Sequence, residues 1–536
     1  MNGFIKQTLM GAGANGALTE NGAISYATTG SELIDQFSKA GTARGRDLND
    51  VWVEQAKIWS ENSLYALRFP FYLRMITRQS NLLEDGVKTE KVQKGQGARD
   101  ESFKRLLWIA RYHADEFYRN LWILPIVGSW KDLWVLLTMD DTLDKEKFFT
   151  VMAEGINSKA HKDLVKKYMP RIRSNNQCTT DWAKKTNTLA KEFAKFAGWS
   201  VKEYREFKAT GKAHDFQRII CSRRYDEINW NTIPGKALLN LVSGNFLKNH
   251  GLEKDYIEWL KKQPVAKFNG YVYELGMKLD DLYPNRLSLV QKITIDKQFD
   301  NLIATAQKDG PAINGNVLVA LDTSGSMDSQ IYGTNGLTSY DVCVSLGIYF
   351  SELNKGEFHN VVAMFDNISS MYKLKSSCFS DKWYEIRHQN IAWGGTSFIS
   401  LVNLIVNTRK GHPEIPLEDF PQTLLVVSDM QFNNCGKQSN YEAMMSKLSE
   451  VFPDDWVKNF KCIWWYCAGR DGSSHDVPAT MDMGGQYLFS GFDGAVISLL
   501  LSGNGEIDEK TGEVKQLSME EAVQKALSQE VLLLVQ

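Results

Sequence analysis

Apolar side chains recur every three to five residues along most of the first 300 positions, which is the spacing of one face of an amphipathic helix. Ser200 followed by Glu203 forms a capping box, and Pro234 lies near the first turn of a further helix. These features predict consecutive helices over residues 31–310, packed as a HEAT-like α-solenoid or irregular array without a fixed repeat period. Three of the stripes are Trp52, Ala56, Trp59, Leu64, Leu67 and Phe71; Phe103, Leu106, Leu107, Ala110, Phe117 and Leu121; and Trp182, Thr186, Leu189, Phe193 and Phe196.

The pattern changes near residue 312, where short, continuously apolar runs alternate with amphipathic helices. The runs cover residues 316–321, 361–365, 423–428 and 462–467. Such runs are typical of a parallel, doubly wound sheet that is buried on both faces. We therefore expect an α/β domain over residues 311–503. A hairpin and short helix are expected over 504–536, and a loosely ordered, glycine-rich lead-in over 1–30.

Composition and cysteine usage limit the function classes. The 536 residues are 43% hydrophobic and 24% charged, which is ordinary for a globular protein. The seven cysteines are scattered without a C-x-x-C pair, which favours a reducing, cytoplasmic compartment over a disulfide framework or a zinc site. No apolar run approaches the length of a membrane span, and no signal peptide is expected. The G-x-G-x-x-G pattern at residues 11–16 has no preceding strand, so no nucleotide cofactor is expected.

The net charge of −2 hides a strongly basic segment. Residues 159–224 contain 17 Lys and Arg against 6 Asp and Glu, a balance of +11, which leaves −13 for the rest of the chain. Such a segment suits an RNA phosphate backbone, although a solvated face or a surface that docks the acidic α/β half would carry the same charge. Trp182 and Trp199 could stack on bases, but helical spacing favours the core for both. The candidate nucleic-acid contacts are Lys166, Lys167, Arg171, Arg173, Lys184, Lys191, Lys195, Arg218, Arg223 and Arg224.

Oxygen-bearing side chains follow two predicted strands and precede one predicted helix. Asp322, Ser324 and Ser326 come directly after the first strand, Thr396 precedes a helix, and Asp429 ends a later strand. Ligands of open α/β sheets bind at the carboxyl ends of the strands, and hard oxygen ligands suit Mg²⁺ or another divalent cation. The order and spacing of the three segments favour a metal site, whereas turn and cap roles are the alternative.

This set resembles the metal-ion-dependent adhesion site of von Willebrand factor A domains at all five positions. The resemblance implies that Ser324, Ser326 and Thr396 bind the ion directly or nearly so. It implies that Asp322 and Asp429 act through bound water or switch their role with the state of the site, and that one coordination position stays open for an acidic group of a protein partner. No Ser–His–Asp or Cys–His arrangement stands near this set, so we expect a protein without catalytic activity.

A helical array followed by an A domain resembles the architecture of the TROVE/Ro ribonucleoprotein family. Several segments look closer to a sister group known mainly as a domain of unknown function. The resemblance implies that the helical array binds RNA. These segments are residues 20–23, 97–100, 124–133, 167–170, 203–205, 229–234 and 428–432.

Three hypotheses follow for function. The first is a non-catalytic, Ro-like RNA-binding protein whose array binds RNA and whose A domain binds Mg²⁺ and a partner. The second is a metal-dependent protein–protein interaction scaffold without nucleic acid. The third, which we favour least, is a metal-dependent hydrolase.

Overall fold

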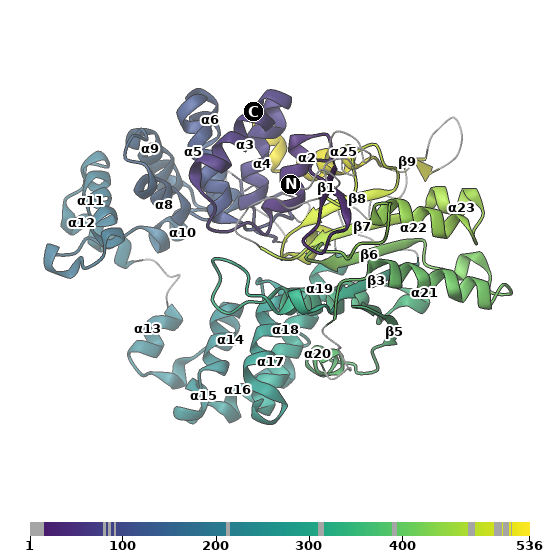
Figure 1. The fold of residues 1–536 in the computed structure, drawn as a ribbon. Helices are drawn as coiled ribbons and strands as arrows, with labels where there is room; N and C mark the ends of the chain where they lie inside the picture. Colours follow the sequence, from purple (N-terminus) through teal and green to yellow (C-terminus); the bar gives the residue numbers. More distant parts are fainter. Residues whose placement is uncertain are drawn as a thin grey trace. The chain divides into compact units, whose positions relative to one another are not determined.

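The protein divides into two compact units in a computed structural model (Figure 1). The first contains Met1–Asp47 and Pro234–Ala526, and the second contains Leu48–Ile233 and Leu527–Gln536. Helices dominate the earlier part of the chain and a six-stranded sheet with helices the later part, as expected. The structure describes residues 16–78, 82–83, 87–89, 93–210, 215–308, 313, 316–387, 394–469, 477–497, 506–507, 514–515 and 517–536.

The division differs from the expected boundary at residue 311. Helices α14 to α18 group with the sheet, because α17 and α18 pack against α19, the helix that covers the central strands. The α-helices of the first unit are α2 (Glu32–Ala40), α14 (Gly235–Ser243), α15 (Phe246–Asn249), α16 (Glu253–Lys262), α17 (Val272–Arg286), α18 (Leu289–Lys308), α19 (Ser339–Leu353), α20 (Phe379–Arg387), α21 (Phe398–Gly411), α22 (Asn440–Ser449), α23 (Asp454–Asn459) and α25 (Met519–Ala526).

The sheet of the first unit has the strand order β5-β4-β3-β6-β7-β8. Neighbouring strands run parallel, except that the edge strand β5 is antiparallel to β4. All four predicted strands are present, within one residue of their expected bounds, while β5 and β8 were not predicted. The strands are β3 (Val317–Asp322), β4 (Val361–Phe365), β5 (Ser369–Lys373), β6 (Thr423–Ser428), β7 (Lys461–Tyr466) and β8 (Gln486–Ser490).

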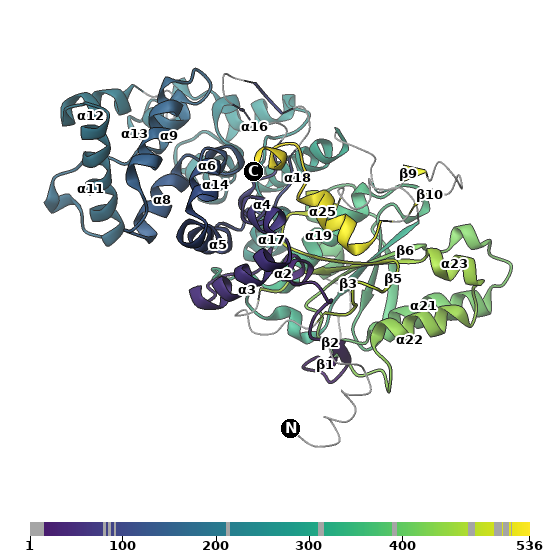
Figure 2. The same ribbon diagram turned by 90° about the horizontal axis from the view of Figure 1, so that it is seen from above.

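Helices cover both faces of this sheet. Successive side chains of a strand point to opposite faces. On β7, Trp465 contacts Phe350 of α19 with ring centroids 5.2 Å apart, and Trp464 contacts Phe398 of α21 at 4.8 Å. Figure 2 shows α19 on one side of the sheet and α21 with α22 on the other. Burial on both faces explains why the strands read as continuous apolar runs.

The described part of the lead-in is more regular than expected. Strands β1 (Gly16–Leu18) and β2 (Ile24–Tyr26) form an antiparallel hairpin with buried residues at its turn and second strand. Helix α2 then packs on β8, where Phe37 meets Phe489 at 5.1 Å. The glycine pattern at residues 11–16 lies outside the described residues except for Gly16. Near the other end, β9 (Glu506–Ile507) and β10 (Val514–Lys515) form the predicted hairpin.

The second unit is built mainly of helices, and its described residues also include the isolated β-bridges Arg78–Gln93 and Leu82–Lys88. Its predicted capping box is present, since Ser200 accepts from the Glu203 amide while the Glu203 carboxylate accepts from the Ser200 amide. None of the helices in the described part of the chain is both long and apolar enough to cross a membrane. The α-helices are α3 (Leu48–Glu61), α4 (Ser63–Arg74), α5 (Arg99–Tyr112), α6 (Ala114–Asn120), α7 (Ile123–Val127), α8 (Lys131–Met139), α9 (Lys145–Asn157), α10 (Lys162–Tyr168), α11 (Asp181–Phe196), α12 (Val201–Ala209) and α13 (Asp215–Cys221).

Residues 527–536 complete the core of the second unit. The Asn120 side chain accepts from the Gln536 amide at 3.0 Å and donates to its carbonyl at 2.7 Å. The Gln529 side chain makes the same pair of bonds with the backbone of Lys94. Leu532 is fully buried, whereas Leu533 beside it is 50% exposed. The terminal segment is therefore part of this unit rather than an appendage of the sheet.

We expect Leu532→Ala to lower the free energy of unfolding of the second unit by about 2–5 kcal/mol, because it leaves a cavity in a packed core. Leu533→Ala, the matched control, should change it by less than about 0.5 kcal/mol. Urea denaturation followed by circular dichroism measures both values. Equal effects of the two substitutions would contradict this placement of the terminal segment.

Candidate functional site

Two of the predicted metal-site segments meet because β3 and β6 are adjacent parallel strands. Asp322 ends β3, and Ser428 ends β6 immediately before Asp429. The Asp322 Oδ1 atom accepts from the amide and the hydroxyl of Ser324, at 3.0 and 2.6 Å. Its Oδ2 atom accepts from the Ser428 hydroxyl at 2.5 Å. The two strand ends are thus tied together through the Asp322 carboxylate.

The third segment, which carries Thr396, reaches the same edge of the sheet. The Gly325 amide donates to the Gly394 carbonyl at 3.1 Å, which joins this segment to the loop after β3. The Thr396 amide donates to the Asn433 side chain at 3.1 Å, and the Asn433 amide donates to the Thr396 carbonyl at 2.8 Å. The structure therefore brings together the three segments that sequence analysis singled out.

The carboxylates of this site are held out of water. Asp322, Ser324, Thr396 and Asp429 are each at most 1% exposed, and Ser326 is half-buried with its hydroxyl 3.2 Å from that of Ser324. Burial, and then the nearby negative charge of Asp429, raise the pKa of Asp322 to about 7. A cation between the two carboxylates would offset both effects.

One atom of the site has no partner among the residues that the structure describes. The Thr396 Oγ1 atom is buried and makes no hydrogen bond. A buried hydroxyl without a partner is costly, so such an atom needs a ligand or a structural explanation. Together with two carboxylates and two serine hydroxyls, it forms an all-oxygen donor set of the kind that suits Mg²⁺. Across the described residues, no three His, Cys, Asp or Glu side chains gather into a metal-binding group.

The structure adds positioning residues that sequence analysis missed. Asn433 and Asn367 hold the glycines before Thr396, with the Gly395 amide donating to Asn367 Oδ1 at 3.0 Å. A Cβ atom at Gly395 would lie 2.6 Å from the Asn433 side-chain nitrogen, so this segment needs glycine there. Only the position of Asn367 two residues after β4, and of Asn433 five residues after β6, could have suggested their role. Asp366, which was left out of the metal set, accepts from the Ile368 amide within its own turn.

The N-terminal hairpin braces the loop that follows Asp429. The Thr19 hydroxyl donates to the Phe432 carbonyl at 2.6 Å, and the Glu20 amide donates to the Gln431 side chain at 2.7 Å. The Asn21 side chain donates to the Gln431 carbonyl at 2.6 Å. Residues more than 400 positions earlier in the chain therefore restrain the segment that carries Asp429.

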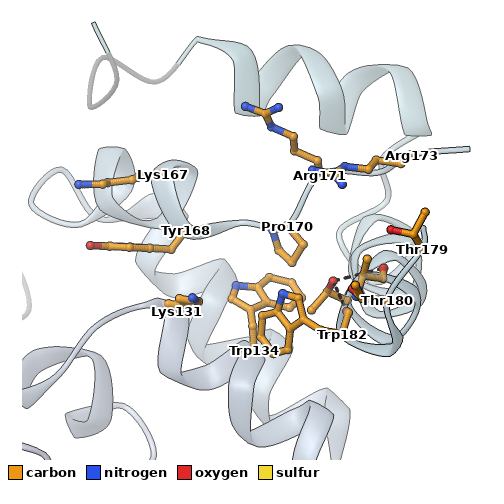
Figure 3. A pocket seen from close by; sticks show the side chains of 12 residues that line it. Lys131, Trp134, Lys167, Tyr168, Pro170, Arg171, Arg173, Thr179, Thr180 and Trp182 are labelled. Atoms are coloured by element: carbon orange, nitrogen blue, oxygen red, sulfur yellow. Dashed lines mark hydrogen bonds between the residues drawn. The ribbon is translucent and has the colours of Figure 1, made fainter. Parts of the chain in front are cut away.

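A second candidate site lies in the second unit, where two pockets share Lys167, Arg171 and Arg173. The first pocket, of about 530 Å³, is drawn in Figure 3 and also includes Lys131 and Trp182. The second, of about 830 Å³, continues toward α12 and α13. None of the described residues that line either pocket is acidic. Within the described part of the chain, neither Lys131 nor any of the three shared cations pairs with a carboxylate.

Only some of the predicted nucleic-acid contacts line these pockets. Lys167, Arg171 and Arg173 line both, and Arg218 lines the second while pairing with Asp215 at 3.5 Å. Lys166 is buried, and its ammonium donates to the Thr210 hydroxyl at 3.0 Å. The remaining predicted residues are exposed but line neither pocket; they are Lys184, Lys191, Lys195, Arg223 and Arg224, of which Lys184 and Arg224 pair with acidic neighbours.

Three basic pocket residues were missed by sequence analysis, namely Lys131, Arg205 and Lys208. Arg205 and Lys208 lie one turn apart on α12 and donate to backbone carbonyls of Ile172 and Lys166, at 3.2 and 3.0 Å. These bonds hold α12 against the end of α10. Burial, and then the charge of Arg171, lower the pKa of Lys208 to about 8. The three-residue spacing on α12 was a usable signal, but Lys131 belongs to a distant segment.

The two tryptophans of the basic segment differ in their surroundings. Trp199 is half-buried, and its ring packs against Phe207 at 4.9 Å and against Phe193 at 6.2 Å. Trp182 is 42% exposed, and its indole faces the Lys131 ammonium at 5.7 Å from the ring centroid. The core placement expected for Trp182 is therefore wrong. It is the second residue of α11, so its side chain projects beyond the apolar stripe of that helix.

Residues 316–532 match a family model described as Domain of unknown function (DUF7788). The matched region begins at β3 and includes all three segments of the oxygen-rich site. The chain is also 23% identical over 539 residues to uncharacterized protein L728 of Acanthamoeba polyphaga mimivirus. That alignment covers 91% of this chain and 85% of the viral protein. Both units of the chain therefore share similarity with the viral protein.

We expect Thr396→Val, measured with a chelator present, to leave the free energy of unfolding unchanged or to raise it by about 1–2 kcal/mol. Valine keeps the shape of threonine and removes a buried hydroxyl that has no partner. Thr294→Val is the matched control, since the buried Thr294 hydroxyl bonds to the Val290 carbonyl and to Tyr256. That substitution should cost about 1–2 kcal/mol. Similar losses in both variants would show that Thr396 has a partner within the protein.

Proposed function

We propose that the chain is a non-catalytic RNA-binding protein. Its second unit binds the RNA phosphate backbone, and its first unit binds a divalent cation and, through it, an acidic group of a protein partner. The observation that carries the RNA proposal is the pair of adjoining pockets lined by Lys and Arg without a single acidic side chain. The likeness of the arrangement to a Ro-type helical array with a von Willebrand factor A domain agrees with this proposal.

The placement of the cations favours a chain of phosphates over one isolated anion. Figure 3 shows Lys131, Lys167, Arg171 and Arg173 spread around the first pocket rather than meeting at one point. Arg205, Lys208 and Arg218 extend the series into the second pocket. A nucleic-acid backbone presents charges at regular intervals along such a surface. A basic surface that only faces solvent has no reason to form two adjoining pockets or to lack carboxylates among the residues that line them.

For the first unit we propose Mg²⁺ or a similar cation. Ser324, Ser326 and Thr396 would offer hydroxyl ligands, while Asp322 and Asp429 would act directly or through water. When bound, the cation would supply a Lewis-acidic position for a carboxylate of the partner. The unpartnered Thr396 hydroxyl supports this site independently of the basic pockets. It therefore also favours the second candidate function, a metal-dependent protein–protein scaffold without nucleic acid.

We expect the Arg171→Ala/Arg173→Ala double variant to bind RNA at least about tenfold more weakly at low salt. In a plot of log affinity against log salt concentration, the slope should be smaller in magnitude by about 1–1.5. Each lost phosphate contact lowers the magnitude of this slope by about 0.7. Filter binding across a salt series measures both quantities. The control is Lys261→Ala/Lys262→Ala, which removes two exposed cations of α16 that line neither pocket. No RNA affinity of the unaltered protein at low salt would eliminate this function and leave the scaffold.

We expect Mg²⁺ at about 100 times its dissociation constant to stabilise the unaltered protein by about 2.7 kcal/mol. Asp322→Asn should abolish this gain while keeping the fold, since the amide retains the shape of the side chain and removes a buried charge. Asp366→Asn is the control, because the Asp366 carboxylate accepts a hydrogen bond from the Ile368 amide within its own turn. Calorimetry with and without chelator measures the shift. Full retention of the gain in Asp322→Asn would refute this cation site.

A pull-down with the same Asp322→Asn variant separates the two candidate functions. Loss of protein partners without any RNA affinity in the unaltered chain supports the scaffold. RNA affinity that persists in the variant supports an RNA-binding second unit that acts independently of the cation.

A further inference from the structure

The indole of Trp182 is exposed, with the Lys131 ammonium 5.7 Å from its ring centroid. Every other tryptophan that the structure describes is buried or half-buried. It lies at the start of α11, where Thr180 already caps the helix by accepting from the Ala183 amide at 3.1 Å. Phe193 on the same helix is fully buried, whereas Phe196 near its end is 43% exposed. An aromatic face of this size left in water is typical of a binding surface.

The pocket in front of Trp182 suits a nucleobase. Trp182, the buried Trp134 and Pro170 provide flat apolar walls, and the volume of about 530 Å³ lies within the range of small-ligand sites. The Lys131 ammonium near the indole leaves a positive charge beside any group that stacks there. An apolar wall combined with a cation matches a base that is followed by its phosphate.

The first pocket also adjoins the second, so a bound RNA strand could continue from one into the other. Lys167, Arg171 and Arg173 line it together with the second pocket, which then passes Arg205 and Lys208. A base held at Trp182 would therefore have its neighbouring phosphates beside these shared cations. An acidic peptide would use the cations but would leave the indole without a stacking partner. In a duplex the bases are already stacked and paired, so only its phosphates could bind here.

We infer that Trp182 is the stacking platform for an unpaired base of single-stranded RNA. The phosphates next to that base lie along Lys167, Arg171 and Arg173 toward the second pocket. This inference rests on the proposed RNA binding and deepens it, because it names the form of RNA that is bound and the side chain that recognises it. The indole supplies affinity for bases without reading their sequence, since every base has a flat face.

The test compares Trp182→Ala with Phe196→Ala. Phe196 lies on the same helix and is 43% exposed, but it lines neither pocket. For a single-stranded RNA of about 12 nucleotides, Trp182→Ala should weaken binding by about 5- to 100-fold, the measured range for losing one stacked base. Phe196→Ala should change it less than about twofold, and Trp182→Phe should retain most of the affinity. The slope against salt should stay the same in all three variants, because no phosphate contact is lost.

Three further ligands isolate the role of the base. A duplex of equal length, and a single strand of equal charge with abasic sites in place of bases, should each bind Trp182→Ala as well as they bind the unaltered protein. Single-stranded DNA should behave as RNA does, because stacking does not involve the 2′-hydroxyl. Equal losses for single strand and duplex, or no loss for the single strand, would overturn the inference while RNA binding itself stands. Absence of binding to every nucleic acid would instead overturn the proposed function.

Photocrosslinking uses the unaltered protein, so its result does not depend on whether the variants fold correctly. A single strand that carries 4-thiouridine should crosslink to the peptide that contains Trp182. Crosslinks confined to peptides outside both pockets would also overturn the inference.

Discussion

The first unit is organised around a buried carboxylate at the junction of two parallel strands. Asp322 accepts from Ser324 in its own loop and from Ser428 on the neighbouring strand, so one side chain joins two strand ends. Burial, and then like-charge repulsion from a second carboxylate, Asp429, raise the pKa of Asp322. The sheet therefore holds two acidic groups together in a place from which water is excluded. Such an arrangement is stable only because hydroxyl and amide donors surround it, and it is suited to a cation.

The surrounding loops have the stiffness that such a site requires. The Thr396 segment is fixed by reciprocal bonds with Asn433 and by the Asn367 side chain. The loop after Asp429 is in turn held by the N-terminal hairpin through Thr19, Glu20 and Asn21. A site whose ligand-bearing loops are positioned in advance loses less entropy when it binds. The hairpin thus contributes to the site although it carries none of the candidate ligands.

The second unit uses charge in a different way. Several exposed cations between α11 and residue 224 pair with acidic neighbours, as in the pairs of Lys184 with Asp181 and Arg224 with Glu227. The cations at the junction of α10, α11 and α12 lack such neighbours and line the two pockets. Ion pairing is thus uneven within one basic segment. Lys184 and Arg224 have carboxylate partners, whereas Lys167, Arg171 and Arg173 have none in the described part of the chain. The chain's net charge of −2 gives no hint of this difference.

Local patterns in the sequence determined strands β3, β4, β6 and β7, the capping box at Ser200, and the oxygen-rich segments after β3 and β6, because these depend on nearest neighbours and on strand ends. The tertiary structure decided the rest. It placed α14 to α18 with the sheet, drew Asn433 and the N-terminal hairpin to the site, and buried Lys166 while exposing Trp182. These outcomes depend on contacts between segments tens to hundreds of residues apart. No period or spacing along the chain records such contacts, since the free energy of burying one side chain is set by whatever packs over it.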